Sequence, residues 1–262
     1  IEVIVSLLKA ADSELRDRAT AMANSLNKEI GSKVETNPSE LVLSGAERVA
    51  TIKSGDVVLN NNFDLIDKFS SASNGVATIF VRNGDDFVRV TTSVKNEKGE
   101  RAVGTKLDRN GAAYKAIMEG KPYIGLADLF GRRFMTRYDP IKEAGGKIVG
   151  VRFIGVDFSD NLAQIKSSIR DLKILKSGYY FAMDAKPGAT YGTMLVHPSL
   201  EGQNALTLKD AKGKFFIKEM LEQKNGATHY PWVDADKGTS NVRDKIAVFS
   251  HFKEWDWVIA GG

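Results

Sequence analysis

The chain has 262 residues, of which 42% are hydrophobic and 27% charged, with a formal net charge of +4 and no cysteine. These fractions exclude collagen-like, disordered and disulfide-scaffold proteins. The lack of cysteine excludes cysteine-ligated zinc, iron–sulfur clusters and thiol catalysis, and it suits an oxidising compartment. There is no run of like charges of the kind that binds nucleic acid, and no apolar stretch approaches the ~20 residues that span a bilayer.

The first thirty residues are predicted to form one long amphipathic helix. At 1.5 Å per residue such a helix is ~45 Å long, and Gly31 is a typical C-terminal stop. Its apolar stripe either packs along the rest of the chain or pairs with a second copy, and both alternatives are left open. The stripe comprises Ile4, Leu8, Ala11, Leu15, Ala19, Met22, Leu26 and Ile30, at spacings of three and four.

The next part of the chain is predicted to be a run of antiparallel strands with one helix. Residues 76–81 and 87–94 are β-branched and aromatic, and the Asn83-Gly84 pair between them is a strong hairpin signal. A helix is predicted over residues 108–118, with Asp108 as its N-cap. Strands are predicted over residues 122–127, 133–138 and 147–158, which together make an α+β module.

A second amphipathic helix is predicted over residues 160–175, and the same order of elements then returns. Strands are predicted over 179–184 and 193–197, a helix over 214–223, and strands over 229–233, 245–252 and 255–260. Tyr123 aligns with Tyr230 at an offset of 107, and Val149 with Val258 at 109. The agreement of these offsets predicts two copies of one module.

Motifs for catalysis, metals and cofactors are lacking. The three histidines have the wrong spacing for a helical metal pair, and no G-x-G-x-x-G, G-x-x-x-x-G-K-[ST] or G-x-S-x-G sequence occurs. The run from Asp234 to Gly238 faintly resembles a calcium loop, but Lys245 stands where a carboxylate is needed, so we interpret it as a polar turn. We predict no enzyme activity, no cofactor and no metal; a hydrolase or transferase is the alternative from another class.

Binding chemistry is better represented on two strands. Alternation along residues 87–94 puts Phe87, Arg89, Thr91 and Ser93 on one face and Thr92 on the other. An arginine beside hydroxyls can bind a small carboxylate, although such a face can also simply be solvated. On a neighbouring strand Phe134, Thr136 and Tyr138 lie opposite Arg133 and Arg137, and an arginine beside aromatic walls is typical of a small anion pocket.

Several motifs resemble a known family. Residues 87–94, 101–108, 120–125, 130–141 and 146–157 resemble the membrane-distal module of a double Cache sensor. Residues 178–181, 197–202 and 255–262 resemble a chemoreceptor Cache module. The order of these motifs is similar to the Cache_3–Cache_2 fusion of bacterial methyl-accepting chemotaxis proteins, from about Asn60 to the end of the chain.

The resemblance implies an α+β fold of two tandem PAS-like antiparallel-sheet modules stacked along the N-terminal helix. The implied parts are a helix and lead-in (1–59), a membrane-distal module (60–158), a connecting helix (159–178) and a membrane-proximal module (179–262). The chain would be the periplasmic sensor domain of a bacterial inner-membrane chemoreceptor, cut from a longer protein between two membrane spans, and would dimerise through the N-terminal helix. A histidine kinase or a cyclic-dinucleotide enzyme is the alternative output.

The resemblance also implies where a small ligand binds. A small organic acid in the membrane-distal module is favoured, and an amino acid or amine is the alternative. The membrane-proximal module is either a weaker site or a spacer, and Arg152 departs from the family pattern as either a pocket residue or an exposed one. The implied distal residues are Arg89, Thr91, Thr92, Lys106, Tyr123, Phe134 and Tyr138, with Arg133 and Arg137 in reserve; the proximal ones are Tyr180, His197, Tyr230 and Trp232.

Overall fold

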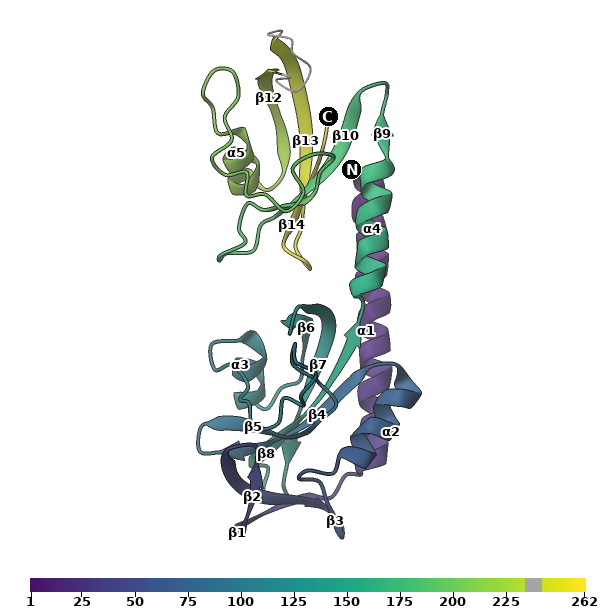
Figure 1. Cartoon of the computed structure of the whole chain (residues 1–262), viewed down its shortest axis with the longest axis vertical. Coiled ribbons are helices and arrows are strands. Elements are labelled where there is room, and N and C mark those ends of the chain that lie inside the picture. Colours follow the sequence, from purple (N-terminus) through teal and green to yellow (C-terminus); the bar gives the residue numbers. More distant parts are fainter. Residues whose placement is uncertain (234–241) are drawn as a thin grey trace. The chain divides into compact units, whose positions relative to one another are not determined.

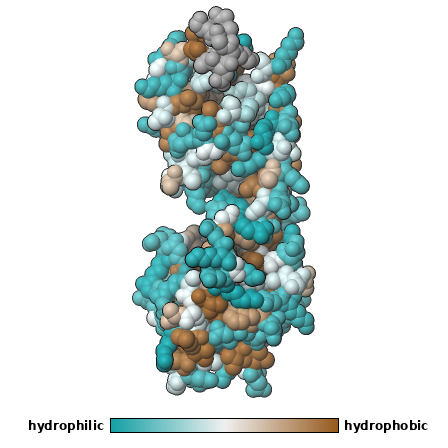
Figure 2. Space-filling model, in the orientation of Figure 1, coloured by the Kyte–Doolittle hydropathy of each residue, from teal (hydrophilic) through white to brown (hydrophobic). Residues whose placement is uncertain are grey.

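The computed structural model describes residues 1–233 and 242–262, which divide into two compact units (Figure 1). One unit comprises residues 13–159, and the other comprises residues 1–12 and 160–262. Hydrophilic residues cover most of the face shown in Figure 2, with smaller hydrophobic patches among them. Among the described residues, none of the helices combines the length and the apolar character of a membrane span.

The predicted N-terminal helix is present as α1 (Glu2–Ile30) and ends at Gly31, whose φ is +85°. Its apolar stripe is buried as predicted, with one exception. Ala11 is only half-buried, whereas the neighbouring Asp12 is 5% exposed. The carboxylate of Asp12 accepts a 2.9 Å hydrogen bond from the indole of Trp255, so a polar partner offsets the cost of its burial.

A small sheet follows α1, in a segment where the sequence indicated only a lead-in. Its antiparallel strands are β1 (Val34–Ser44), β2 (Glu47–Ser54) and the two-residue β3 (Val57–Val58). The β1–β2 register shifts between Asn37 and Leu41, because Pro38 and the polar residues after it interrupt the pairing. This interruption hides the alternation that would have predicted the strand.

The first module is a five-stranded antiparallel sheet of order β5-β4-β8-β7-β6 with two helices (Figure 1). The elements are α2 (Phe63–Ser73), β4 (Val76–Asn83), β5 (Asp86–Thr92), α3 (Ala112–Met118), β6 (Tyr123–Leu129), β7 (Arg132–Lys142) and β8 (Ile148–Asp157). The hairpin at Asn83-Gly84 is confirmed, and Gly84 has a φ of +61°. Helix α3 begins later than predicted, because the Asp108 side chain accepts from the amide of Asn110 in a turn before the helix.

The second module contains a sheet of order β11-β10-β14-β13-β12, with β9 paired to β10. The elements are α4 (Ser159–Asp171), β9 (Lys173–Ile174), β10 (Gly178–Asp184), β11 (Met194–Val196), α5 (Phe216–Gln223), β12 (Gly226–Val233), β13 (Val242–Phe252) and β14 (Trp257–Gly261). Helix α4 ends at Asp171 rather than at Leu175, and Trp255 lies in the β13–β14 turn. The matching strand orders confirm the predicted repeat, so the α+β prediction holds.

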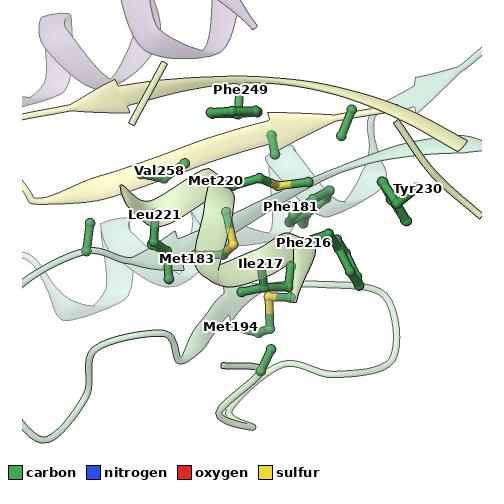
Figure 3. Close-up of a cluster of buried hydrophobic side chains, with 14 residues drawn as sticks. Phe181, Met183, Met194, Phe216, Ile217, Met220, Leu221, Tyr230, Phe249 and Val258 are labelled. Carbon is green, nitrogen blue, oxygen red and sulfur yellow. The ribbon is translucent and has the colours of Figure 1, made fainter. Parts of the chain in front are cut away.

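Each sheet has one face that packs on its module's own helix. In the first module, Phe80, Phe153 and Tyr138 share a buried cluster with Ala113 and Ile117 of α3. In the second module, α5 lies on the sheet and its residues Phe216, Ile217, Met220 and Leu221 pack against β10 and β14 (Figure 3). We call these the helix-covered faces of the two sheets.

Candidate functional site

The helix-covered face of the second module contains a cavity of about 340 Å³. It lies beside the core cluster of β10 and α5 shown in Figure 3, and Phe181, Phe216 and Tyr230 belong to both. The described residues that line it are Tyr179, Phe181, Met194, His197, Pro198, Ser199, Leu200, Leu208, Phe216, Ile217, Tyr230, Trp232, Val233 and Lys245. This volume is near the lower end of the range for small-molecule sites.

His197 presents a fixed hydrogen-bond donor at this cavity. It follows β11, where the chain turns at Pro198, and its Nδ1 accepts from the backbone amides of Ser199 and Leu200, both at 3.1 Å. Two donors to Nδ1 leave the proton of the neutral ring on Nε2. Burial, together with the nearby Lys245 charge, lowers the pKa of His197 to about 4, so the ring is neutral at physiological pH.

Lys245 supplies a positive charge to the same cavity. It is on β13, directly opposite Tyr230 of β12, and its Nζ lies 5.3 Å from the ring centre of Tyr179 and 5.8 Å from that of Trp232. Among the described lining residues, Lys245 is the only one that carries a formal charge at neutral pH, since His197 is neutral. The formal charge of the described lining residues is therefore positive, which favours an anion.

Aromatic rings form the rigid wall of the cavity. The rings of Phe216 and Tyr230 are stacked with centroids 4.2 Å apart, and Trp232 meets Phe216 edge-on at 5.8 Å. His197 meets Tyr179 edge-on at 5.2 Å. Burial raises the pKa of the Tyr230 hydroxyl well above its usual range, so this group stays protonated. The arrangement combines a cation, a neutral imidazole donor and phenol groups around an apolar space.

The cation on the helix-covered face of the first module is Arg89, which is buried among core side chains. Its guanidinium lies 5.0 Å from the ring centre of Phe80 and donates to the hydroxyl of Thr105 at 2.5 Å. Arg89 is 8% exposed, its Nε is buried without a hydrogen-bond partner, and burial lowers its pKa to about 10. Burial also raises the pKa of Tyr138, beside this guanidinium, to about 12.

The predicted face of β5 is wrong from Thr91 onward, because the strand contains a β-bulge. Ile79 pairs with Thr91 and Phe80 with Arg89, so Val90 is an extra residue and alternation shifts by one. Thr92 therefore lies on the same face as Arg89, and its hydroxyl meets that of Thr78 at 2.6 Å. Thr91 lies on the opposite face and donates to the carbonyl of Asn62.

The remaining first-module residues separate into two groups. Tyr123, Phe134 and Tyr138 lie on the helix-covered face with Arg89, since the register joins Tyr123 to Tyr138 and Tyr138 to Phe153. Lys106 and Arg133 are away from that face. Lys106 forms ion pairs with Glu47 at 3.2 Å and Asp86 at 3.3 Å, and Arg133 pairs with Asp128 at 2.5 Å.

Arg137 and Arg152 lie on the opposite face of the first sheet. Arg137 donates from Nε to both carboxylate oxygens of Asp139, at 3.1 and 3.2 Å, and Arg152 is the cross-strand neighbour of Asp139. Burial lowers the pKa of Arg152, and the Asp139 charge opposes that shift. The reserve role of Arg137 and the pocket role of Arg152 are therefore not supported by their positions.

No group of metal-ligating side chains occurs among residues 1–233 and 242–262. The calcium-like run from Asp234 to Gly238 lies outside the described residues.

Comparison with known proteins identifies the family. The family model described as the Cache 3/Cache 2 fusion domain matches residues 1–262. The chain belongs to the Cache 3/Cache 2 fusion family. Domains of this family are sensory ligand-binding modules, and the chain is a sensor domain of this kind, as the resemblance implied.

Solved structures similar to this Cache domain include receptor sensor domains. A methyl-accepting chemotaxis protein of Vibrio parahaemolyticus RIMD 2210633 is 26% identical, with 39% of this chain and 69% of that chain covered and a TM-score of 0.33. The periplasmic sensory domain of the Campylobacter jejuni chemoreceptor Tlp1 is 14% identical, with 99% and 90% covered and a TM-score of 0.48. No curated protein matches the sequence.

One further structure is similar to this Cache domain in its fold. An extracellular ligand-binding receptor from Desulfohalobium retbaense DSM5692 has a TM-score of 0.50 and 13% identity, and the match covers 99% of this chain and 38% of that one.

Three of the four predicted proximal residues line the cavity of the Cache domain, and Tyr180 does not. His197, Tyr230 and Trp232 line it. Tyr180 is on the other face of β10, where it lies against Gly261. Tyr179 also lines the cavity and was not predicted, although it lies two residues before Phe181 and so shares its face.

Lys245 was also missed. Its strand was predicted to begin there, but a strand's first residue gives no sign of which face it occupies. The signal that would have found it is the offset of 107, which relates Tyr138 to Lys245 as it relates Tyr123 to Tyr230.

Proposed function

We propose that this Cache domain is the extracytoplasmic sensor of a bacterial membrane chemoreceptor, and that it binds a small organic monocarboxylate in the second-module cavity. The observation that carries the proposal is the presence of Lys245 and the Nε2–H of His197 at one cavity walled by aromatic rings. The functional parts proposed are a lead-in (1–59), a ligand-free or weakly binding module (60–158), a connecting helix (159–178) and the binding module (179–262).

The residue types favour a carboxylate. An ammonium group and an imidazole N–H are donors that a carboxylate accepts from, and charge-assisted hydrogen bonds are roughly twice as strong as neutral ones. Leu200, Leu208 and Ile217 line the same cavity and offer contact to a short apolar chain. One cation beside apolar side chains fits an acid with a single charge and a small apolar body.

The cavity moves the favoured site from the membrane-distal module to the membrane-proximal one. Arg89 stays a second candidate because its buried Nε has no partner, which is costly unless a ligand completes it. The guanidinium already contacts the ring of Phe80 and the hydroxyl of Thr105. A ligand there would compete with these contacts, whereas the second-module cavity is already open to a ligand.

The second module offers a path from the cavity to the N-terminal helix. Lys245 is on β13, and β13 pairs with β14 through the turn that contains Trp255. Trp255 donates to Asp12 of α1. A ligand that prefers one of two arrangements of this strand shifts their populations by its differential affinity, and the hydrogen bond would pass that shift to α1.

Isothermal titration against acetate, propionate, lactate, pyruvate, succinate and alanine tests the site directly. We expect binding of a monocarboxylate, and its loss in Lys245→Met. The matched control is Lys253→Met, which removes an exposed lysine just beyond the end of β13. Arg89→Met should leave binding intact; the reverse pattern, loss with Arg89→Met and retention with Lys245→Met, would return the site to the first module.

Dimerisation through α1 is part of the proposal. Val3 and Leu7 on this helix are 81% and 49% exposed, whereas the residues that follow them, Ile4 and Leu8, are buried. A second copy of the chain would cover the exposed pair. Sedimentation equilibrium with and without ligand should show a dimer that Val3→Glu disrupts, and a monomer at every concentration would contradict it.

A further inference from the structure

The turn between β9 and β10 exposes large apolar side chains that the fold does not use. Leu175 at its tip is 95% exposed, and Leu172 before β9 is 44% exposed. Leu175 also has a φ of +52°, a conformation that residues with a side chain seldom adopt. Because so exposed a side chain adds almost nothing to the packing of the second module, its presence calls for a contact outside the module.

The charges around this turn are mainly positive. Lys173 and Lys176 flank Leu175 and are exposed, and the nearest acidic residue in sequence is Asp171, whose carboxylate is 3.5 Å from the hydroxyl of Ser167. Apolar side chains flanked by lysines are the composition of segments that lie in the interface of an anionic membrane.

The turn lies at the end of the module where the last residue of the chain is found (Figure 1). Strand β9 pairs with β10 at Gly178. The amide of Tyr179 donates to the carbonyl of Gly262 at 3.1 Å, and the amide of Gly262 donates to that of Tyr179 at 3.2 Å. The end of the chain is therefore held beside the start of β10, three residues from Leu175.

We propose that residues 172–177 are a lipid-contact turn, in which Leu172 and Leu175 enter the interface of the bilayer while Lys173 and Lys176 bind anionic headgroups. The proposal rests on the proposed function, under which this domain belongs to a receptor held at a membrane. A contact too weak to recruit a free domain is sufficient here, because a membrane anchor makes it intramolecular.

The chain contains no cysteine, so one engineered cysteine gives a single labelling site. We would label Ser177→Cys with an environment-sensitive fluorophore and hold the domain on vesicles by a C-terminal histidine tag and a nickel-chelating lipid. On phosphatidylglycerol-containing vesicles we expect a blue-shifted emission, absent on phosphatidylcholine alone. A label at Ser39→Cys, on the exposed part of β1, is the control and should not shift.

Variants then identify the residues responsible. Leu175→Ser should lower the inserted fraction about tenfold, and each of Lys173→Gln and Lys176→Gln about fivefold. Leu43→Ser, which removes a 60% exposed leucine from β1, is the matched control and should have no effect. An unshifted label at residue 177 on both vesicles, or equal insertion of Leu175→Ser and the parent, would overturn the proposal.

Two more measurements separate the causes of failure. An emission shift that appears without vesicles as protein concentration rises would assign the turn to a protein contact and overturn the lipid assignment. Calorimetry on the same labelled protein tests the ligand site independently of lipid. Ligand binding with no insertion would refute the lipid contact alone, whereas insertion without ligand binding would refute the proposed ligand site alone.

Discussion

The two modules share a strand order but differ in what fills the helix-covered face. The offset of 107 that relates Tyr123 to Tyr230 also relates their cross-strand partners, Tyr138 and Lys245. In the first module Tyr138 packs on the ring of Phe153, with centroids 4.8 Å apart. In the second module Lys245 occupies the matching position, and a cavity opens beside it. A tyrosine ring in the core of the first module is therefore replaced by a flexible cation at a cavity in the second.

A cation alone does not make a binding site. The first module has a cation on this face too, but Arg89 is buried against Phe80 and its pKa falls to about 10 through desolvation. Lys245 is half-buried and lies at the edge of open space. The two modules therefore differ in how open the surroundings of the cation are, and not in whether a cation is present.

The largest expected effect tests whether the first module is filled. Phe153 is completely buried, so Phe153→Ala should reduce the free energy of unfolding by about 3–5 kcal/mol. All three tryptophans are in the second module, so their fluorescence reports that module while circular dichroism reports both. We expect urea to cause an early loss of circular dichroism without a tryptophan change. Phe130→Ala, at a 38% exposed site, is the control, and a loss below about 1 kcal/mol for Phe153→Ala would contradict tight packing.

The second prediction replaces the cation of the second module by the residue that the first module has. Lys245→Tyr should weaken monocarboxylate binding by about 10–150-fold, the effect of losing a hydrogen bond to a charged group worth about 1.5–3 kcal/mol. Titration calorimetry measures the loss. The reciprocal change, Tyr138→Lys, should create no binding, because Tyr138 is buried in one cluster with Phe153 and Phe80. Binding gained in Tyr138→Lys would contradict the proposal that only the second module can bind the ligand.

Sequence reasoning predicted the architecture well because architecture depends on periodicity. Three patterns carried this prediction: the long apolar stripe of α1, the Asn83-Gly84 hairpin and the repeated order of strands and helices. Each stays recognisable when the bounds of an element are wrong by one residue. The sheet β1–β3 was missed where Pro38 and its polar neighbours interrupt a strand. The architecture could therefore be predicted without knowing how the side chains pack.

The site was harder to predict because it depends on single-residue register and on volume. A bulge at Val90 put Thr92, and not Thr91, beside Arg89. Choosing Tyr180 in place of Tyr179 is the same error of one residue, which turns a side chain to the opposite face of the sheet. The hollow beside Lys245 is set by how the rings of Phe216, Tyr230 and Trp232 pack, and no sequence pattern encodes that volume.

A smaller effect is expected from pH in the second module. The folded-state pKa of His197 is about 4, below its ordinary value of 6.5, so the unfolded chain takes up a proton first as pH falls. Stability of this module should be constant above pH 6.5 and fall between pH 6.5 and 4, by about 1–2 kcal/mol once solvent access through the cavity is allowed for. Urea titrations by tryptophan fluorescence at several pH values measure this slope.

His197→Gln should remove most of that slope, because it leaves no imidazole to titrate at this position. His229→Gln is the matched control, since His229 is exposed on β12 and should leave the slope unchanged. A slope that persists in His197→Gln would show that another group in the second module titrates in this range.

The smallest effects are expected at Lys106 and Arg133, which the family resemblance placed in the pocket of the first module. Both are at least partly solvent-exposed and paired with carboxylates, Lys106 with Glu47 and Asp86, and Arg133 with Asp128. Exposed ion pairs contribute about 0–1 kcal/mol, so Lys106→Ala and Arg133→Ala should change stability by about 0.5 kcal/mol or less. Neither should alter ligand binding by calorimetry. Loss of binding in either variant, with Lys245→Tyr unaffected, would mean that the first module binds the ligand through the rim of its sheet, and that the cavity around Lys245 serves another purpose.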